Sequence, residues 1–220
     1  MNAFLRLPRR ELRSGFTLIE LLAVILIISI LAAALSPMVL SAVGASEVSA
    51  CQTNQGKIHQ AFVQHEIKYR DTKFGAYPTA SGVAFFSQLY QREAITPSKA
   101  NAEMMTCPGV NKSALAIGSM DWEEWWTDTE LVTGDYSAYA GRDTKNFPLR
   151  KMAANEPLLG DDNDGSMNHG TTTNVLFGDG DVRKYELKVL QEDGVLTQEE
   201  DVLLIGPDSP IEELRKLSLD

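Results

Sequence analysis

The clearest pattern in the chain is a run of apolar residues close to the N-terminus. Residues 16–35 read FTLIELLAVILIISILAAAL, and Glu20 is the one charged residue among them. As a helix, about twenty apolar residues span the hydrocarbon core of a bilayer, which is roughly 30 Å thick. Three arginines lie just before the run: Arg9, Arg10 and Arg13. By the positive-inside rule, we predict a single transmembrane helix over residues 16–38 with its N-terminus in the cytoplasm.

The helical pattern continues beyond the apolar run. Over residues 39–70, apolar or small residues recur at helical spacing with polar residues between them. This pattern predicts an amphipathic continuation of the same helix. A helix from Phe16 to about Tyr69 would be roughly 80 Å long. Proline removes one backbone hydrogen bond of a helix, so we expect a kink at Pro37.

Residues 71–185 alternate short apolar pieces with turn-forming residues, which is typical of one globular domain. Helical spacing predicts a short helix over residues 83–93, and alternation predicts a strand at residues 136–139. The clearest strand signal is a hairpin, in which residues 174–177 and 182–185 are joined by Gly-Asp-Gly-Asp.

Charge and motifs exclude several classes of function. The 220 residues carry a formal net charge of −10, and the chain beyond its basic start is the acidic part. Such a surface repels phosphate, so we expect no nucleic-acid partner. The sequence contains no nucleophile elbow, phosphate-binding loop or HExxH motif, and we predict that the protein is not an enzyme. Two cysteines are too few for a disulfide-dense scaffold.

Two simple interpretations of the N-terminus are possible. A cleaved signal peptide would end at the alanines 32–34, but the apolar region of a signal peptide is usually shorter than this run. A plain signal anchor fits the length and the flanking charge. Neither explains Glu20, because an unpaired carboxylate inside a bilayer is costly.

A resemblance gives a third interpretation. The segment Gly15-Phe16-Thr17-Leu18-Ile19-Glu20 resembles the prepilin processing motif of type IV pilins and type II secretion pseudopilins. The resemblance implies that a prepilin peptidase removes a leader of residues 1–15 by cutting between Gly15 and Phe16, and that Phe16 is then N-methylated. It also implies that Glu20 meets the N-terminal ammonium of a neighbouring subunit. Because both charges are poorly solvated in an isolated subunit, pairing them would select the assembly register.

A second resemblance lies near the C-terminus. His169 is followed by nine residues and then Asp179-Gly180, which resembles the H-X9-DG segment of a large group of prepilin-type proteins, the DUF1559-like group. Cys51 and the pair Cys107-Pro108 resemble two further features of that group. Together these resemblances imply an α+β, pilin-like fold, with a long N-terminal helix packed on a small antiparallel β-sheet.

Two interpretations of the H-X9-DG segment stay open. In the first, Asp179 and Gly180 form the hairpin turn and His169 fixes this turn by hydrogen bonding. In the second, a cluster of carboxylates binds calcium, because oxygen ligands favour this ion. Some type II secretion pseudopilins carry calcium in a C-terminal loop. The candidate ligands are Asp161, Asp162, Asp164, Asp179 and Asp181.

Cys51 and Cys107 are expected to form a disulfide, since both lie beyond the anchor, on the oxidising side of the membrane. The alternative is two separate buried thiols.

The tryptophans Trp122, Trp125 and Trp126 either cover the edge of a small core or form a contact surface. Residues 186–220 form an acidic C-terminal extension, which either packs on a neighbour or remains a solvated tail.

These observations predict a structural subunit that polymerises into a type II secretion pseudopilus or a type IV pilus-like fibre. Its expected partners are the prepilin peptidase, identical or related pilin subunits and the assembly machinery. We expect it to pass once through the bacterial inner membrane, with the globular domain in the periplasm or on a cell-surface fibre. The alternatives are a minor or tip pilin that binds a surface or substrate, and a membrane-anchored, metal-dependent enzyme.

Overall fold

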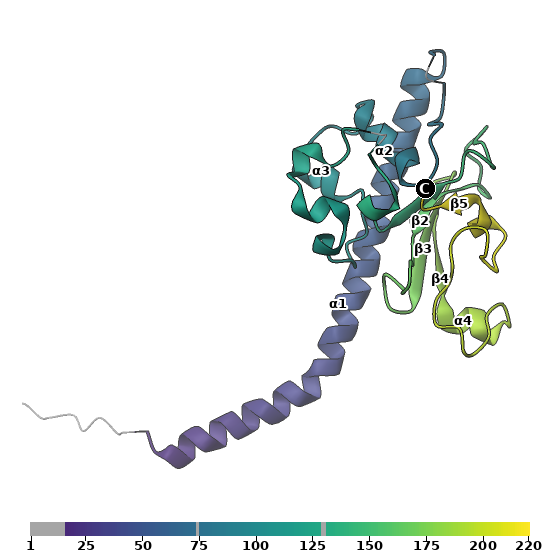
Figure 1. Ribbon diagram of the computed structural model, residues 1–220. Helices are drawn as coiled ribbons and strands as arrows, with labels where there is room; N and C mark the ends of the chain where they lie inside the picture. The colour runs from purple at the N-terminus through teal and green to yellow at the C-terminus, as the bar shows by residue number, and fades with distance from the viewer. Residues whose placement is uncertain (1–15, 74, 129–130) are drawn as a thin grey trace, which may run out of the picture. The chain divides into compact units, whose positions relative to one another are not determined.

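The computed structural model describes residues 16–73, 75–128 and 131–220. The chain divides into two compact units, residues 1–42 and residues 43–220, and the second is called the globular unit below. Helix α1 (Leu18–Tyr69) is continuous through the end of the first unit and the start of the globular unit (Figure 1). The predicted continuation of the N-terminal helix to Tyr69 is therefore confirmed.

The remaining elements belong to the globular unit. Its longer elements are α2 (Val83–Gln91), α3 (Lys99–Glu103), β1 (Tyr139–Arg142), β2 (Pro157–Asp161), β3 (Thr172–Phe177), β4 (Val182–Glu186), α4 (Leu187–Glu192) and β5 (Leu217–Ser218). Short 3-10 helices lie at Lys112–Ala114, Ala116–Ser119, Trp122–Glu124, Gly134–Tyr136 and Glu213–Lys216. The strands form one antiparallel sheet in the order β4-β3-β2-β1-β5. A long helix packed on a small antiparallel sheet is the α+β, pilin-like architecture that the sequence predicts.

One face of the sheet packs on helices. The part of α1 inside the globular unit buries residues at helical spacing, and α2 adds a second apolar face. Alternate residues of a strand point to opposite faces, so one set of strand side chains meets these helices. The core on this face includes Ile58 and Phe62 of α1, Phe85, Phe86 and Leu89 of α2, and Tyr139, Leu159 and Leu176 of the sheet.

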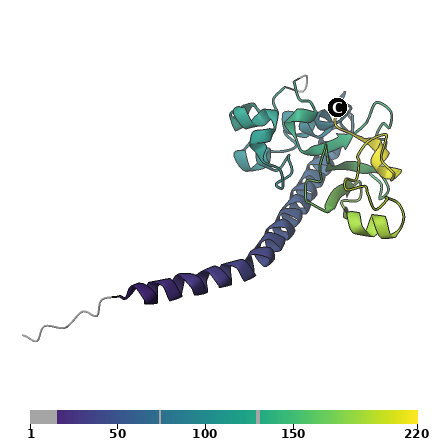
Figure 2. The same ribbon diagram turned by 60° about the horizontal axis from the view of Figure 1, so that its bottom comes forward.

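The C-terminal segment covers the other face. The strand residues that alternate with the first set, Ala140, Val175 and Phe177, form a second core with apolar residues from the end of the chain. Figure 2 shows α4 and the C-terminal segment, coloured green to yellow, beside the strands. Among them, Leu203, Leu214 and Leu217 are fully buried. Residues 186–220 are thus part of the globular unit, and their interpretation as a solvated tail is wrong.

The strand predicted at residues 136–139 begins later than expected, because β1 starts at Tyr139. The hydroxyl of Ser137 donates to Met105 O at 2.8 Å, and Ala138 N donates to Thr106 Oγ1 at 2.9 Å. These groups bond to the segment after α3, so residues 137 and 138 do not join the sheet.

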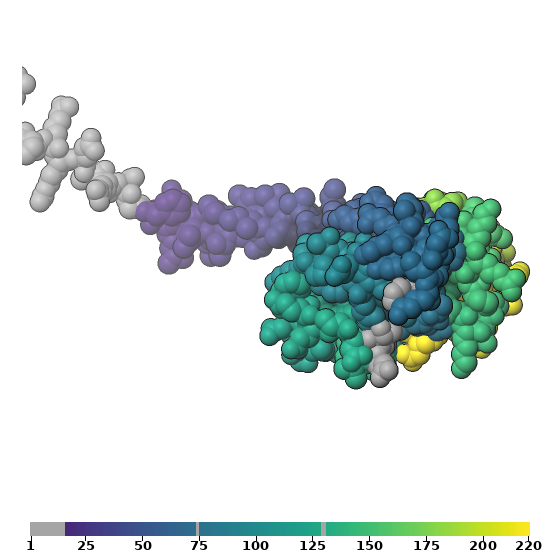
Figure 3. Space-filling view, turned by 90° about the horizontal axis from the view of Figure 1, so that it is seen from above, coloured from purple at the N-terminus to yellow at the C-terminus, as the bar shows by residue number. Residues whose placement is uncertain are grey.

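Two of the three tryptophans belong to the core. Trp126 is completely buried and Trp125 is 7% exposed, whereas Trp122 is partly buried against the same core. They lie in the part of the chain after α3, which appears in teal in Figure 3 beside the blue residues that precede it. Tryptophans that fill a core leave little aromatic surface for binding a partner, so the structure favours the first of the two interpretations.

The predicted hairpin is confirmed as β3 and β4, which pair through five residue positions. In its turn, Gly180 N donates to Phe177 O at 2.9 Å, and Gly180 has a φ of +89°. Residues other than glycine rarely adopt this backbone conformation. A Cβ atom at Gly180 would also lie 2.9 Å from the imidazole ring of His59, which approaches the turn from α1.

We predict that Gly180→Ala lowers the free energy of unfolding by about 1–3 kcal/mol, through backbone strain and the contact with His59. Urea unfolding of the detergent-solubilised chain measures this loss. Gly194→Ala is the matched control, because Gly194 has a φ of +72° and open space around its Cβ position. An equal loss in the two variants would mean that the close approach of His59 adds nothing.

Candidate functional site

The N-terminal end of α1 is closed by a pair of side chains. Thr17 N and Thr17 Oγ1 each donate to Glu20 Oε2 at 2.8 Å, and Glu20 N donates to Thr17 Oγ1 at 3.2 Å. This reciprocal arrangement is a capping box, which satisfies backbone N–H groups of the first helical turn. Glu20 is therefore held at the start of the helix by its own chain. Phe16 is exposed, and Gly15 lies outside the described residues.

The surface of α1 in the first unit is apolar and open. Every residue from 16 to 42 is exposed. By length and composition this helix can cross a membrane, and within the described residues its most apolar window has no buried position. Pro37 lies inside it, and the helix is uninterrupted there. The kink at Pro37 stays a prediction.

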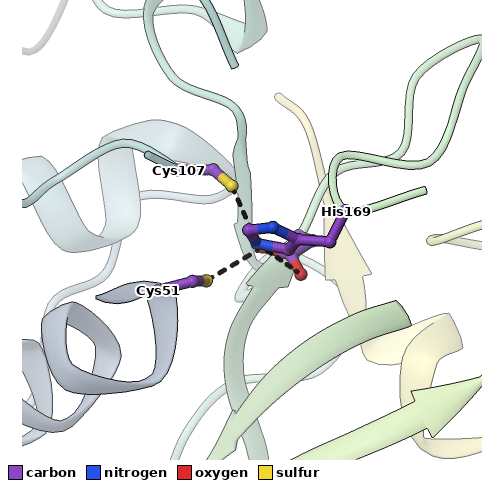
Figure 4. A group of neighbouring side chains, drawn as sticks. Cys51, Cys107 and His169 are labelled. Carbon is purple, nitrogen blue, oxygen red and sulfur yellow. Dashed lines mark hydrogen bonds and ion pairs between the residues drawn. The ribbon is translucent and has the colours of Figure 1, made fainter. Parts of the chain in front are cut away.

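A second group of reactive side chains lies inside the globular unit. It consists of Cys51 on α1, Cys107 in the loop after α3, Asp161 at the end of β2 and His169 in the loop between β2 and β3. The candidate ligand atoms of these residues all lie within 4.8 Å of one another. Figure 4 shows both sulfur atoms pointing toward the imidazole of His169. These four residues are called the Cys/His/Asp cluster below.

Local structure explains why the four side chains meet. Cys51 lies on the buried face of α1, one turn before Gln55. Asp161 ends β2 beside Asn174 of β3, whose N and Nδ2 donate to Asp161 Oδ2 at 2.7 and 3.1 Å. His169 forms an isolated bridge with the first residue of β3, which places its ring next to the end of β2.

The contacts inside the cluster are short. Cys51 Sγ donates to Asp161 Oδ1 at 3.2 Å, and Cys107 Sγ lies 3.1 Å from His169 Nε2. His169 Nε2 is 3.7 Å from Asp161 Oδ2, and both side chains are fully buried. The hydroxyl of Tyr139 lies 3.4 Å from Cys51 Sγ. The cluster is therefore a group of polar side chains that is surrounded by the apolar core.

Burial changes the proton affinities of these groups. It raises the pKa of Asp161 to about 7 and lowers the pKa of His169. A hydrogen bond with Cys107, together with burial, raises the pKa of Cys51 above the ordinary range of a thiol. Burial also raises the pKa of Tyr139. All four shifts favour the neutral form of the side chain, because a charge is poorly solvated there.

The expected disulfide between Cys51 and Cys107 is not formed in this structure, in which both cysteines are free and buried. The sulfur atoms lie near enough to interact, but each is turned toward another partner. Cys51 bonds to Asp161, and Cys107 bonds to His169. The alternative of two thiols describes the structure, although the thiols lie in one cluster instead of separately.

The five aspartates suggested as calcium ligands do not come together. Asp161 lies beside Asn174 in the first half of β3, and Asp162 and Asp164 follow it. Asp179 and Asp181 lie in the turn that follows β3, at the opposite end of this strand. Among the described residues, the group with metal-ligand geometry includes only Asp161 of the five. The antiparallel register separates the others.

His169 does not fix the Asp179-Gly180 turn, because it faces the cluster at the other end of β3. The turn is contacted by His59 of α1, whose Nε2 lies 3.1 Å from Gly178 O. No sequence motif marks His59, Gln55 or Asn174 as a site residue. Helical spacing could have identified Gln55, because a residue one turn after Cys51 lies on the same buried face of the helix.

The comparison with family models identifies the N-terminus. Residues 12–36 match the prokaryotic N-terminal methylation motif. This is a prepilin-type N-terminus. The match supports a type IV pilin-like or pseudopilin subunit, and the prepilin motif covers the start of α1, with Phe16 and Glu20, as well as Gly15. No curated protein and no solved structure matches the chain.

The prepilin motif fits a membrane-anchored protein, as does the long apolar helix, the one such helix among the described residues. The motif also points to a structural subunit in preference to an enzyme. It does not extend to the globular unit, so the H-X9-DG resemblance remains an expectation from the sequence.

Proposed function

We propose that this protein is a structural subunit of a pilus-like fibre, such as a type II secretion pseudopilus. It is made as a precursor that passes once through the inner membrane, with residues 1–15 in the cytoplasm. A prepilin peptidase cuts after Gly15 and methylates Phe16. The mature chain then polymerises with identical or related subunits through the apolar part of α1, and the assembly machinery carries the globular unit outward.

The match of residues 12–36 to the methylation motif carries this proposal. The exposed apolar surface of residues 16–42 supports it, because such a surface is stable only in lipid or against other apolar helices. Before assembly the membrane provides this environment. In a fibre, the corresponding helices of neighbouring subunits provide it.

The capping box refines the role of Glu20. In the single subunit, Glu20 already accepts hydrogen bonds from Thr17 N and Thr17 Oγ1. A neighbouring N-terminal ammonium would add an opposite charge to these neutral donors, in a region where charge pairs are strong. Two roles of Glu20 must therefore be separated: closing the helix end and attracting the next subunit.

Three variants separate processing, capping and charge. Gly15→Leu is expected to block cleavage, so that intact mass retains residues 1–15. Glu20→Ala and Glu20→Gln are expected to be cleaved and methylated normally but to enter fibres poorly in competition with wild type. Glutamine also closes a capping box, so Glu20→Gln removes the charge while keeping the cap. Mass spectrometry of the N-terminal peptide and fibre fractionation measure these outcomes.

Normal assembly of Glu20→Gln, with failure of Glu20→Ala alone, would show that the cap matters and the charge does not. Retention of residues 1–15 in the wild-type chain, in the presence of an active prepilin peptidase, would contradict the whole proposal.

A further inference from the structure

We propose that Cys51, Cys107, Asp161 and His169 bind a structural zinc ion inside the globular unit. This inference does not depend on the fibre role, because all four ligands lie outside the prepilin motif. It also replaces the two sequence-based expectations for these residues, a disulfide and a calcium site, by one site.

The donor set is typical of zinc. Two thiolates, one imidazole and one carboxylate are all established ligands of this ion, and structural zinc sites are usually four-coordinate. Calcium prefers six to eight oxygen ligands, so a group with two sulfur atoms does not suit it.

The spacing of the donor atoms is close to that of a tetrahedral site, although two of three donor-to-donor distances are about 0.1–0.2 Å below the ideal range and an ion would move these donors slightly apart. Ligand atoms about 2.0–2.3 Å from a zinc ion at tetrahedral angles lie about 3.3–3.8 Å from one another. The distances from Cys107 Sγ to His169 Nε2, from Cys51 Sγ to Asp161 Oδ1 and from His169 Nε2 to Asp161 Oδ2 are 3.1, 3.2 and 3.7 Å. The four donors come from α1, two loops and a strand end, so one ion would join segments that are distant in the sequence.

Hydrogen-bond donors surround the anionic ligands from outside. Asn174 N and Asn174 Nδ2 donate to Asp161 Oδ2, and Gln55 Nε2 donates to Cys51 Sγ at 3.5 Å. The Tyr139 hydroxyl is also placed to donate to Cys51 Sγ once this sulfur is a thiolate. Such outer donors orient metal ligands and stabilise their charge.

The cluster is difficult to explain as ordinary packing. Its neighbourhood contains three of the buried polar atoms without a hydrogen-bond partner in the described chain: Gln55 Oε1, His169 Nδ1 and Asn174 Oδ1. Buried thiols and a buried carboxylate also cost free energy unless something compensates them. A doubly charged ion would neutralise most of the negative charge of two thiolates and a carboxylate. Burial on all sides leaves no open coordination position, which distinguishes a structural from a catalytic site.

Metal analysis of the full-length chain in detergent tests the proposal. Protein purified from zinc-supplemented cells under reducing conditions should contain one zinc per chain by plasma mass spectrometry. Cys107→Ser and His169→Gln should lose the zinc. Asp164→Asn and Asp179→Asn remove acidic residues outside the cluster and should keep it. Calcium in excess should not displace the ion.

Two further measurements do not depend on ligand variants that fold poorly. Cobalt added to the metal-free wild type should give sulfur-to-cobalt charge-transfer absorption and the visible bands of a tetrahedral site. Tyr139→Phe keeps the ring in the core and removes one outer donor, so it should weaken zinc affinity by about 10-fold.

Absence of both zinc and the cobalt bands in folded, reduced protein would overturn the proposal. The proposal would also be overturned if the intact mass of protein isolated from the periplasm showed Cys51 and Cys107 oxidised to a disulfide. Full zinc content in Asp161→Asn and Cys107→Ser would overturn the four-ligand assignment.

Discussion

Trp126→Ala is expected to lower the free energy of unfolding of the globular unit by about 3–5 kcal/mol. The Trp126 ring is fully buried, and its centroid lies 6.5 Å from the rings of both Phe86 and Tyr136. Its Nε1 donates a hydrogen bond of 3.0 Å to Ala102 O. Alanine would leave a cavity between α2 and the segment after α3, and Ala102 O would lose one hydrogen bond while keeping the one from Met105 N at 3.3 Å.

Calorimetry of the detergent-solubilised chain measures this loss. Trp126→Phe separates its two causes, because phenylalanine keeps most of the ring volume and removes only the bond to Ala102. Trp122→Ala is the matched control, since Trp122 is only partly buried. A loss for Trp122→Ala as large as that for Trp126→Ala would contradict the assignment of Trp126 to the core.

Arg142→Met is expected to cost about 3–4 kcal/mol, because it leaves a partly buried carboxylate without its main partner. Arg142 lies in β1 and is 3% exposed. Its guanidinium pairs with Glu156 at 2.5 Å and donates to Phe147 O at 2.8 Å and to Pro157 O at 3.0 Å. Methionine is similar in length and fills much of the same space, so the loss reports mainly the missing charge and hydrogen bonds.

The control is another arginine–glutamate pair in the same chain. Arg70 and Glu66 are 2.6 Å apart on the surface of α1, and the arginine side chain is 61% exposed. Arg70→Met should cost no more than about 0.5 kcal/mol. Urea unfolding followed by near-ultraviolet circular dichroism compares the two variants. The double variant Arg142→Met/Glu156→Gln should recover part of the lost free energy of unfolding. If it recovers none, the unpaired carboxylate of Glu156 is not the cause of the loss.

The parts of the fold that sequence could predict are those set by local patterns. The length of α1 follows from an apolar run and helical spacing that continue without a strong stop before residue 70. The β3–β4 hairpin follows from two β-prone runs around an Asp-Gly turn. Strand β5 could not be predicted, because it has two residues and exists only where they meet β1.

The Cys/His/Asp cluster shows what local patterns cannot predict. The sequence marks Cys51, Cys107, Asp161 and His169 as candidates, but it predicts a disulfide, a carboxylate group and a turn for them separately. Their spacing along the chain carries no information about their meeting. It depends on the register of β2 against β3 and on which face of α1 meets the sheet, and both are set by tertiary packing.

The position of the C-terminal segment has a consequence for the order of events during folding. Until residues 203–217 have been synthesised, the second core lacks Leu203, Leu214 and Leu217, so Ala140, Val175 and Phe177 are only partly covered, and β1 lacks its neighbour β5. Contacts between such distant parts of a chain form late in folding. The globular unit therefore completes its fold only after nearly the whole chain has been synthesised. A chain that ends before Leu203 would therefore keep a half-covered sheet with apolar surface exposed, which is a site for aggregation.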